Sequence, residues 1–471
     1  MKTKNIVYAS VAIALTACAT QPRTDRFATA FAQADSLAAS IAAPTFPDVR
    51  MSIDAFGAST QADAATNKAA ICAAIDSVSA LGGGTVAVPA GSWLTGPLTL
   101  KSHVNLCIEE GATLMFSTDH QDYLPAVLTR WEGVDCYNLH PLIYAYGQTD
   151  IAITGSGTID GCGNEESWWF MKGRPQYGWR EGLLSQELGG RARLLEFDQN
   201  QVPVEQRIMT IEDALRPQLI NIYNCSNVLI ENVTLRNSPF WVIHPLMVEN
   251  MIVRGVRIDS HGPNSDGCDP ESSRNVLIEN CFFNTGDDCI AIKSGRNFDG
   301  RRWNRPAENI VVRKCEMKNG HGGVVIGSEI AGGFRNLWVE NCTMDSPELD
   351  RVIRIKTNDC RGGVIENIFV RNVEVGQCRE AVVKINLKYE PDEVCTRGFV
   401  PYVCNVNLQN VNSRKSRHGI FVVGLDESDE YVDGLTIENC RFDGVEDGNR
   451  VSQMRNLHFD NLLINGQPAQ E

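Results

Sequence analysis

The sequence is poor in basic residues and has no transmembrane-length apolar run and no paired metal-binding motif. Its 471 residues contain 43 Lys and Arg against 58 Asp and Glu, a net charge of −15. A chain this acidic is a poor partner for nucleic acid. No C-x-x-C or H-x-x-H pattern occurs, so a zinc site is not expected and we predict no cofactor. An anionic ligand would have to be held by local cations.

The apolar run at the N-terminus, residues 6–15, is too short to span a bilayer as a mature helix. Two lysines precede it, the pattern of a signal peptide. Leu15-Thr16-Ala17-Cys18 then resembles the bacterial lipobox, and no Asp follows the cysteine. This predicts a signal peptide over residues 1–18, lipidation of Cys18, a flexible tether over residues 19–45, and an outer-membrane lipoprotein facing the periplasm or surface of a Gram-negative cell. An ordinary signal peptide with an incidental cysteine is the alternative.

The second half of the chain lacks helical runs between its repeats, which argues against an α/β sheet. A word close to N-(V/I/L)-x-(V/I/F)-x-N-(C/V/L) recurs nine times at intervals of 22–38 residues. In Asn275–Cys281, Val276 and Ile278 alternate with Leu277 and Glu279, the period of a strand with one buried face. Repeated strands at this interval favour a solenoid, and we predict an all-β, single-stranded, right-handed parallel β-helix.

Asparagines near the end of the repeat words predict tight corners, because asparagine tolerates the left-handed conformation. These are Asn232, Asn280, Asn341, Asn372, Asn410, Asn439 and Asn461. The pattern at Asn67–Ala80, closed by Gly82, predicts a helix that caps the N-terminal end. Residues 46–471 are therefore expected to form one elongated domain, and we expect a monomer.

The cysteines point to the core. Without Cys18, fifteen of the sixteen remain, an odd number that cannot pair completely, and the sequence leaves any disulfide pairing open. Four of them share the last position of the repeat word, where small apolar side chains would stack inside the solenoid: Cys281, Cys315, Cys342 and Cys440.

Polar motifs interrupt successive repeats, at Asn264-Ser265-Asp266, Asp287-Asp288, Gly320-His321-Gly322 and Arg354-Ile355-Lys356. Residues at equal distances after the start of the repeat word are expected to lie one above another on adjacent coils, about 4.7–4.9 Å apart. Asp287 and His321 each lie twelve residues after the start of their words, which predicts that they are neighbours. Three carboxylates, one imidazole and two cations should thus line up across stacked strands.

Crowded carboxylates keep one acid protonated, because like charges raise one pKa. That is the requirement of glycoside hydrolysis, in which a protonated carboxyl protonates the leaving oxygen and an ionised partner activates water. A calcium site built from Asp266, Asp269, Asp287 and Asp288 is the alternative. Further cations surround the acids: Lys293, Arg296, Arg301, Arg302 and Arg305, of which we interpret Arg301 and Arg302 as a solvated loop.

From residue 46 to 466 the four motifs together resemble glycoside hydrolase family 28, the polygalacturonases, in particular its exo-acting bacterial members. The resemblance implies that Asp287 is the general acid, Asp266 and Asp288 hold and deprotonate the water, and His321 supports the acid. It also implies inversion of the anomeric centre. Substrate carboxylates would contact Arg354 and Lys356, with Asn264 and Lys293 nearby. Ser265 departs from the usual threonine, keeping the hydroxyl but losing a methyl.

The long insertion from Gly161 to Arg207 is expected to wall off one end of the site and so favour exo action; a loop with its own small core is the alternative. It contains Trp168, Trp169, Phe170, Tyr177 and Trp179. His244 and His261 lie near the same coils, more as structural than as substrate-binding residues. The expected partner is a galacturonan, with membrane contact only through the lipid. A rhamnogalacturonan hydrolase, a calcium-dependent pectate lyase and a non-catalytic binder remain alternatives.

Overall fold

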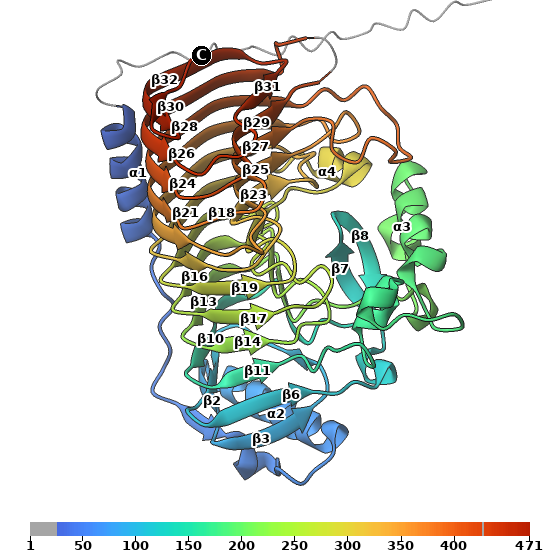
Figure 1. The fold of residues 1–471 in the computed structure, drawn as a ribbon. Helices are drawn as coiled ribbons and strands as arrows, with labels where there is room; N and C mark the ends of the chain where they lie inside the picture. Colours follow the sequence, from blue (N-terminus) through green and yellow to red (C-terminus); the bar gives the residue numbers. More distant parts are fainter. Residues whose placement is uncertain (1–25, 426–427) are drawn as a thin grey trace, which may run out of the picture.

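The computed structural model describes residues 26–425 and 428–471, so the predicted signal peptide and Cys18 lie outside the described residues. The chain winds into a parallel β-helix whose coils stack along one axis (Figure 1). This confirms the predicted fold. Within the described residues, no helix combines the length and apolar character needed to cross a membrane.

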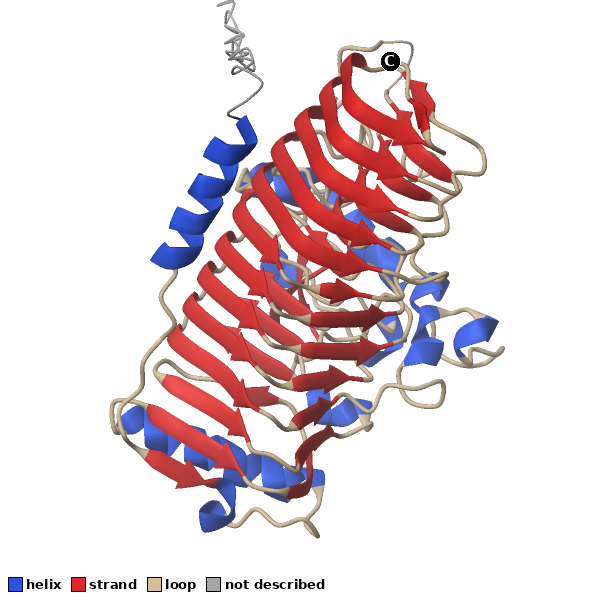
Figure 2. Cartoon of the chain, turned by 60° about the vertical axis from the view of Figure 1, so that its left-hand side comes forward, coloured by secondary structure: helices blue, strands red, loops and turns tan. Residues whose placement is uncertain are grey.

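Three columns of strands form the solenoid. The first column contains β1 (Arg50–Ser52), β2 (Gly84–Val88), β5 (Val104–Ile108), β10 (Thr149–Gly155), β13 (Ser226–Glu231), β16 (Glu249–Arg254), β18 (Arg274–Glu279), β21 (Ala307–Arg313), β24 (Phe334–Met344), β26 (Val364–Val375), β28 (Tyr402–Ser413), β30 (Val432–Phe442) and β32 (Arg455–Ile464). The second contains β3 (Gly91–Thr95), β6 (Ala112–Phe116), β11 (Thr158–Asp160), β14 (Thr234–Arg236), β17 (Arg257–Ser260), β19 (Phe282–Thr285) and β22 (Glu316–Met317). From β24 onward the first two columns merge into long bent strands, visible in Figure 2.

The third column positions the site. It runs through β4 (Leu98–Thr99), β9 (Ile143–Tyr146), β12 (Ile220–Tyr223) and β15 (Ile243–Leu246), and continues through β20 (Ile290–Ile292), β23 (Val324–Gly327), β25 (Arg351–Lys356), β27 (Ala381–Asn386), β29 (His418–Val423) and β31 (Arg450–Ser452). Isolated bridges at Cys268 join its two halves. A short antiparallel pair, β32 with β33 (Gln467–Pro468), ends the chain.

The repeat word lies on the first column in strict register. Val276 pairs with Met251 and Ile310, and Ile278 with Val253 and Val312, so apolar side chains stack inside every coil. The four cysteines of the word are at most 3% exposed, as predicted. All seven predicted corner asparagines adopt positive φ, between 51° and 63°.

The first asparagine of the word forms a ladder that the sequence did not reveal. Asn275 donates its amide to Asn250 at 3.0 Å, and Asn309 donates to Asn275 at 3.1 Å. The same contact recurs from Asn336 to Asn309 and from Asn367 to Asn336. Each side chain is therefore satisfied by its neighbours one coil away, which fixes the register of the stack.

The predicted cap is present as α2 (Ala64–Ala80), which covers the first coils. Asp63 begins it by accepting a hydrogen bond from the Thr66 amide at 2.8 Å. The prediction of a flexible tether over residues 19–45 was wrong for its second part. Residues 26–40 form helix α1 (Arg26–Ser40), which lies along the outside of the first column (Figure 1, Figure 2).

Helix α1 is held by an apolar face. Phe27, Ala30, Phe31, Ala34 and Ala38 recur at helical spacing and are all buried. They cover outward-facing apolar residues of the first column: Ala152, Leu229, Ile252, Leu277, Val311 and Trp338. Leu277 thus points away from the solenoid interior and is still only 1% exposed. Small apolar residues that resemble a linker by composition are here the contact surface of a packed helix.

Candidate active site

The acids lie in the turns between the second and third columns. Asp266 follows β17, and Asp287 and Asp288 lie between β19 and β20 on the next coil. The buried hydroxyl of Ser265 joins the two turns: it donates to the Ser260 carbonyl at 2.7 Å and accepts from the Gly286 amide at 3.1 Å. Serine is sufficient for this structural role, because the hydroxyl alone makes both contacts.

One oxygen from each of Asp266, Asp287 and Asp288 lies within 4.8 Å of the other two. The Asp266 and Asp288 side chains are 5% and 0% exposed, whereas that of Asp287 is 17% exposed. A water molecule at a hydrogen-bond distance of about 2.8 Å can reach oxygens spaced this closely. Asp287 is therefore the most accessible of three carboxylates that can share one water.

The predicted contact between Asp287 and His321 is present. His321 Nδ1 lies 2.9 Å from Asp287 Oδ1, and the His321 amide donates to the Asp287 carbonyl at 3.1 Å. The register of β20 with β23, in which Ile290 pairs with Val324, brings the two turns together. Counting residues from the repeat word therefore located this pair correctly.

Cations surround the acids. Lys356 Nζ lies 2.8 Å from Asp288 Oδ2, and Arg354 Nη1 lies 3.4 Å from Asp288 Oδ1. Lys293 Nζ lies 3.8 Å from Asp266 and 3.1 Å from Glu329. Each catalytic candidate thus has a positive neighbour, and this compensation leaves little electrostatic demand for the calcium ion of the alternative hypothesis.

The carboxylates differ in protonation. Burial, together with the charge of Asp287, raises the pKa of Asp266 well above its ordinary value, with Lys293 opposing the shift. Burial would also raise the pKa of Asp287, but the charge and hydrogen bond of His321 outweigh it and hold this pKa low. Asp287 in turn raises the pKa of His321 to about 9, with burial opposing. Near neutral pH the proton shared by this pair is therefore held by His321 and not by Asp287.

A cavity of about 590 Å³ lies over this cluster. Asn264, Asp266, Asp287, Lys293, His321, Arg354 and Lys356 all line it, so every predicted site residue reaches the cavity except Asp288, which lies behind it. Asn264 adopts a positive φ of 56°, and its Oδ1 accepts a hydrogen bond from Arg216 at 2.9 Å.

The insertion forms one wall of the cavity through η3 (Trp169–Lys172), η4 (Pro175–Tyr177), η5 (Gln186–Leu188) and α3 (Gly190–Gln199). Its lining residues are Lys172, Arg174, Gln176, Tyr177, Glu187 and Arg191. Only Tyr177 among its predicted aromatic residues lines the cavity. Trp168 is fully buried against Tyr123 at a ring distance of 5.1 Å, and Trp169 donates to the Ser238 carbonyl at 3.0 Å. Trp168 and Trp169 thus pack against the core of the solenoid and not in a separate core of the insertion, while the insertion presents polar side chains to the cavity.

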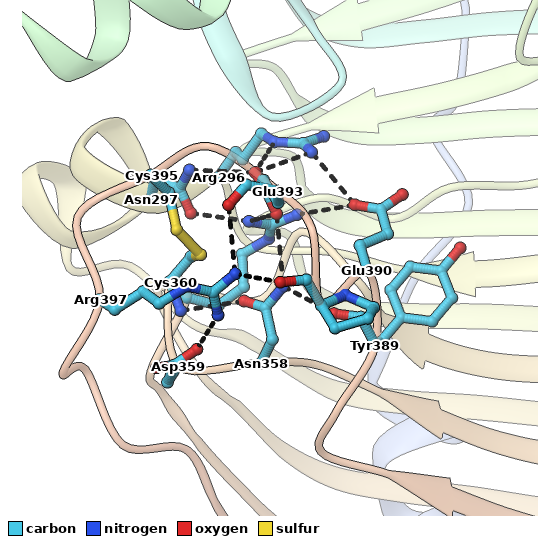
Figure 3. Close-up of a disulfide and its surroundings, with 12 residues drawn as sticks. Arg296, Asn297, Asn358, Asp359, Cys360, Tyr389, Glu390, Glu393, Cys395 and Arg397 are labelled. Carbon is cyan, nitrogen blue, oxygen red and sulfur yellow. Dashed lines mark hydrogen bonds and ion pairs between the residues drawn. A yellow bond between two sulfur atoms is a disulfide. The ribbon is translucent and has the colours of Figure 1, made fainter.

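A second wall comes from the loop after β27, which the sequence did not single out. Tyr389 and Glu390 line the cavity, with the Tyr389 ring 5.5 Å from Arg354 and 5.4 Å from Lys356. Figure 3 shows how the loop is fastened: Cys395 forms a disulfide with Cys360, and Glu393 accepts from Arg296 at 2.9 Å. Both cysteines lie outside the repeat words, so the repeat pattern gave no signal for this pair.

The hairpin of β7 (Val127–Trp131) and β8 (Val134–Asn138) adds Glu132 to the cavity. Beside it, Arg216 is fully buried without a carboxylate partner in the described part of the chain. It donates to the carbonyls of Pro239 and Pro263 at 2.8 and 2.7 Å and to Gln186 at 3.2 Å. Burial lowers its pKa to about 10. This guanidinium joins the insertion to the turn that carries Asp266.

Other predicted residues lie elsewhere. His244 is buried and bonded to Glu271 at 2.8 Å, and His261 contacts Asp259 at 3.1 Å outside the cavity. The interpretation of two arginines as a solvated loop was wrong, since they belong to α4 (Asn297–Trp303). Arg301 donates to the Cys360 carbonyl at 2.6 Å, and Arg302 pairs with Asp135 at 2.7 Å. Arg296 is buried among carboxylates, and Arg305 donates to the Met247 carbonyl.

Comparison with known proteins finds similarity to one family of enzymes. The family model described as glycosyl hydrolases family 28 matches residues 209–462. A hyperthermoactive exopolygalacturonase from Thermotoga maritima, of known structure, is 38% identical, with a TM-score of 0.88 over 93% of this chain and 96% of that chain. An exo-poly-alpha-D-galacturonosidase of Dickeya chrysanthemi is 27% identical over 85% of this chain and 69% of its own. A probable polygalacturonase of Vitis vinifera is 32% identical over 62% of this chain, and the match spans 53% of the grape protein.

Proposed function

The chain belongs to glycosyl hydrolases family 28, and from this we propose that it hydrolyses the α-1,4 bonds between galacturonic acid units of pectin. The observation that carries the proposal is the contact of Asp287 with His321 beside two further carboxylates and the Arg354–Lys356 pair. Arginine recognises a carboxylate through paired hydrogen bonds, which favours a uronic acid over a neutral sugar.

Proton delivery falls to Asp287, the most accessible of the three acids. The imidazolium of His321 passes its proton to Asp287, which gives it to the glycosidic oxygen as the bond from that oxygen to C1 breaks. His321, with its pKa near 9, is a proton source across the neutral range. The leaving sugar departs as an alcohol, so no charge remains on its oxygen.

Asp266 and Asp288 hold the attacking water. The water adds its oxygen to C1 and loses a proton to Asp288, which in the free protein is paired with Lys356 and Arg354. When a substrate carboxylate binds these two cations, it competes with Asp288 for their charge. Bound uronate would thus leave the Asp288 oxygens freer to accept a hydrogen bond from the attacking water.

We propose that the reaction inverts the anomeric centre. Inverting enzymes usually separate two carboxyls by about 6.5–9.5 Å, and retaining ones by about 5–5.5 Å. Here oxygens of three carboxylates lie within 4.8 Å of one another, so distance alone favours retention. The third carboxylate changes the geometry, since water can sit inside the cluster instead of between two distant acids. Proton NMR of the first product decides: a β-anomer supports inversion, and an α-anomer contradicts it.

Exo action is supported by the two walls, from residues 161–207 and from the loop after β27, which give the cavity a closed side. The test is chromatography of products from polygalacturonic acid with EDTA present and ultraviolet absorbance recorded. Saturated monomer or dimer from the first minutes supports an exo enzyme, and a ladder of oligomers indicates an endo enzyme. Calcium-dependent, ultraviolet-absorbing products would instead reveal a lyase. Cleavage of rhamnogalacturonan and not of polygalacturonic acid would mean that the protein is a rhamnogalacturonan hydrolase.

Lipidation of Cys18 also remains a proposal, supported by the lipobox-like residues 15–18. The described chain begins at Arg26, which donates to Asn407 and pairs with Glu438 on the first column, away from the cavity. A lipid attached eight residues upstream would leave the cavity free to receive polymer. Labelling with a fatty-acid analogue should mark the wild-type chain and not Cys18→Ala; label on both would contradict the proposal.

A further inference from the structure

The outer face of the third column continues beyond the cavity toward the C-terminal end. In register with Arg354, the next coils place Lys384, then Phe421, then Arg450. Each is one coil, about 4.8 Å, beyond the last. Figure 1 shows their strands β25, β27, β29 and β31 stacked in one row. The carboxylate-binding residue of the site is therefore the first of four aligned side chains.

These side chains contact one another as a track. Lys384 Nζ lies 4.7 Å from the centre of the Phe421 ring, and the Arg450 guanidinium lies 5.2 Å from it. A ring between two cations offers an apolar face for a sugar and positive charge on both sides for carboxylates. Phe421 is partly exposed and Arg450 is exposed, although an aromatic side chain at this position gains nothing from water.

The charges of the track are not all neutralised. Lys384 pairs with Glu380, whereas Arg450 has no carboxylate within ion-pair distance in the described part of the chain. Most exposed arginines of the C-terminal coils do have such a partner, for example Arg417 with Asp447 at 2.6 Å and Arg455 with Asp433 at 2.8 Å. Among the described residues, the positive charge of Arg450 thus has no partner of opposite charge.

The track and two anchors of the insertion lie on different coils of the solenoid. Two anchors of the insertion are on coils that precede the acids, where Trp169 donates to Ser238 and Gln186 accepts from Arg216. The track lies on coils that follow them.

We propose that Lys384, Phe421 and Arg450 form additional binding sites for a galacturonan, holding the polymer that trails from the cavity. This rests on the proposed function and adds to it a region that favours polymers over short oligomers. The polymer repeats a carboxylate on every sugar, and the track repeats a cation or ring on every coil. Phe421 stacks on a sugar ring while Lys384 and Arg450 pair with carboxylates.

The test measures binding separately from catalysis. In the Asp287→Asn background, the affinity for polygalacturonate and for digalacturonate is measured by calorimetry, with and without Phe421→Ala or Arg450→Ala. Each added change should weaken polymer binding about three- to tenfold, the range of a single ring or cation contact, and leave the dimer unaffected. Arg455→Ala is the matched control, an exposed arginine of the same coil on the first column.

If a variant weakened binding of polymer and dimer equally, or if Arg450→Ala did not weaken polymer binding, the proposed binding role of the track would be wrong. So would an equal effect of Arg455→Ala. Because binding is measured without turnover, a protein that binds polymer through the track and yet releases no sugar would contradict the proposed function and not this inference. In the active protein the same variants should raise KM for polymer with little change in kcat.

Discussion

Replacing Asp287 by Asn tests the assignment of the acid most directly. The amide keeps the size of the side chain but has no acidic proton to give to the leaving oxygen, and His321 loses the negative charge 2.9 Å from its Nδ1. General acid catalysis is worth about 10²–10⁴ in rate, or about 2.7–5.5 kcal/mol. We expect kcat on polygalacturonate to fall by that factor, with KM changing little, because Asp287 does not bind a substrate carboxylate.

The leaving group separates the acid from the other two carboxylates. An aryl galacturonide releases a phenolate that needs almost no protonation, so Asp287→Asn should retain most of its activity on it. Asp266→Asn should lose activity on both substrates, since water must still be held. Asp259→Asn is the control, because Asp259 also contacts a histidine, His261, but lies outside the cavity. An equal loss on polymer and aryl substrate in Asp287→Asn would refute the assignment.

Asp287→Asn should also change the pKa of His321. The pKa of His321 is raised to about 9 by Asp287, so any stability from this pair is fully present below about pH 6.5 and lost as the pH rises through about 9. NMR of the His321 ring should show a midpoint near 9 in the wild type and nearer 6.5 in Asp287→Asn. An unchanged midpoint would mean that another group sets this pKa.

Further predictions concern activity at high pH and the parts that hold the site. The kcat/KM of the wild type should fall above about pH 9 as His321 deprotonates, and His321→Gln should remove this limb of the pH profile; a limb that persists would contradict the proton-source role. Phe31→Ala should lower the free energy of unfolding by about 3–5 kcal/mol in urea titrations, because Phe31 is 1% exposed in helix α1, whereas a loose tether would show no loss. Replacing Cys360 and Cys395 together by Ser should cost about 3–4 kcal/mol for the 35-residue separation and raise KM, since the loop carrying Tyr389 is freed; unchanged KM would show that the disulfide does not hold the wall. Arg216→Met should lower kcat at least tenfold, because four oxygen acceptors lose their donor and the turn of Asp266 loosens; unchanged kcat would leave Arg216 a purely structural residue.

The local sequence pattern was sufficient to predict the solenoid fold and the positions of most residues of the site. The alternation in Asn275–Cys281 gives a strand with one buried face wherever it occurs, and a stack of such strands has only one direction of growth. In that stack, distance along the sequence becomes position in space. This is why the equal offsets of Asp287 and His321 from their repeat words predict that the two residues are neighbours.

The repeat pattern predicted nothing correct about the segments that leave the coils. Helix α1 was taken for a linker because its alanines acquire meaning only beside the apolar outer face of the first column. The arginines of α4 were taken for a loop because their partners are distant in sequence: the Cys360 carbonyl lies 59 residues from Arg301, and Asp135 lies 167 residues from Arg302. Nor could spacing reveal that the proton of the acid rests on His321, since that depends on burial and on neighbouring charges.

The repeat, the corner asparagines, the buried cysteines and the order of the catalytic motifs could all be inferred from the sequence, because each depends on contacts between a residue and its equivalent one coil away. How the cavity is enclosed could be seen only in the folded chain. Its walls come from residues 161–207 and from the loop fastened by Cys360 and Cys395, which obey no period. Their positions depend on long-range ion pairs and on a buried Arg216, interactions that no local pattern encodes.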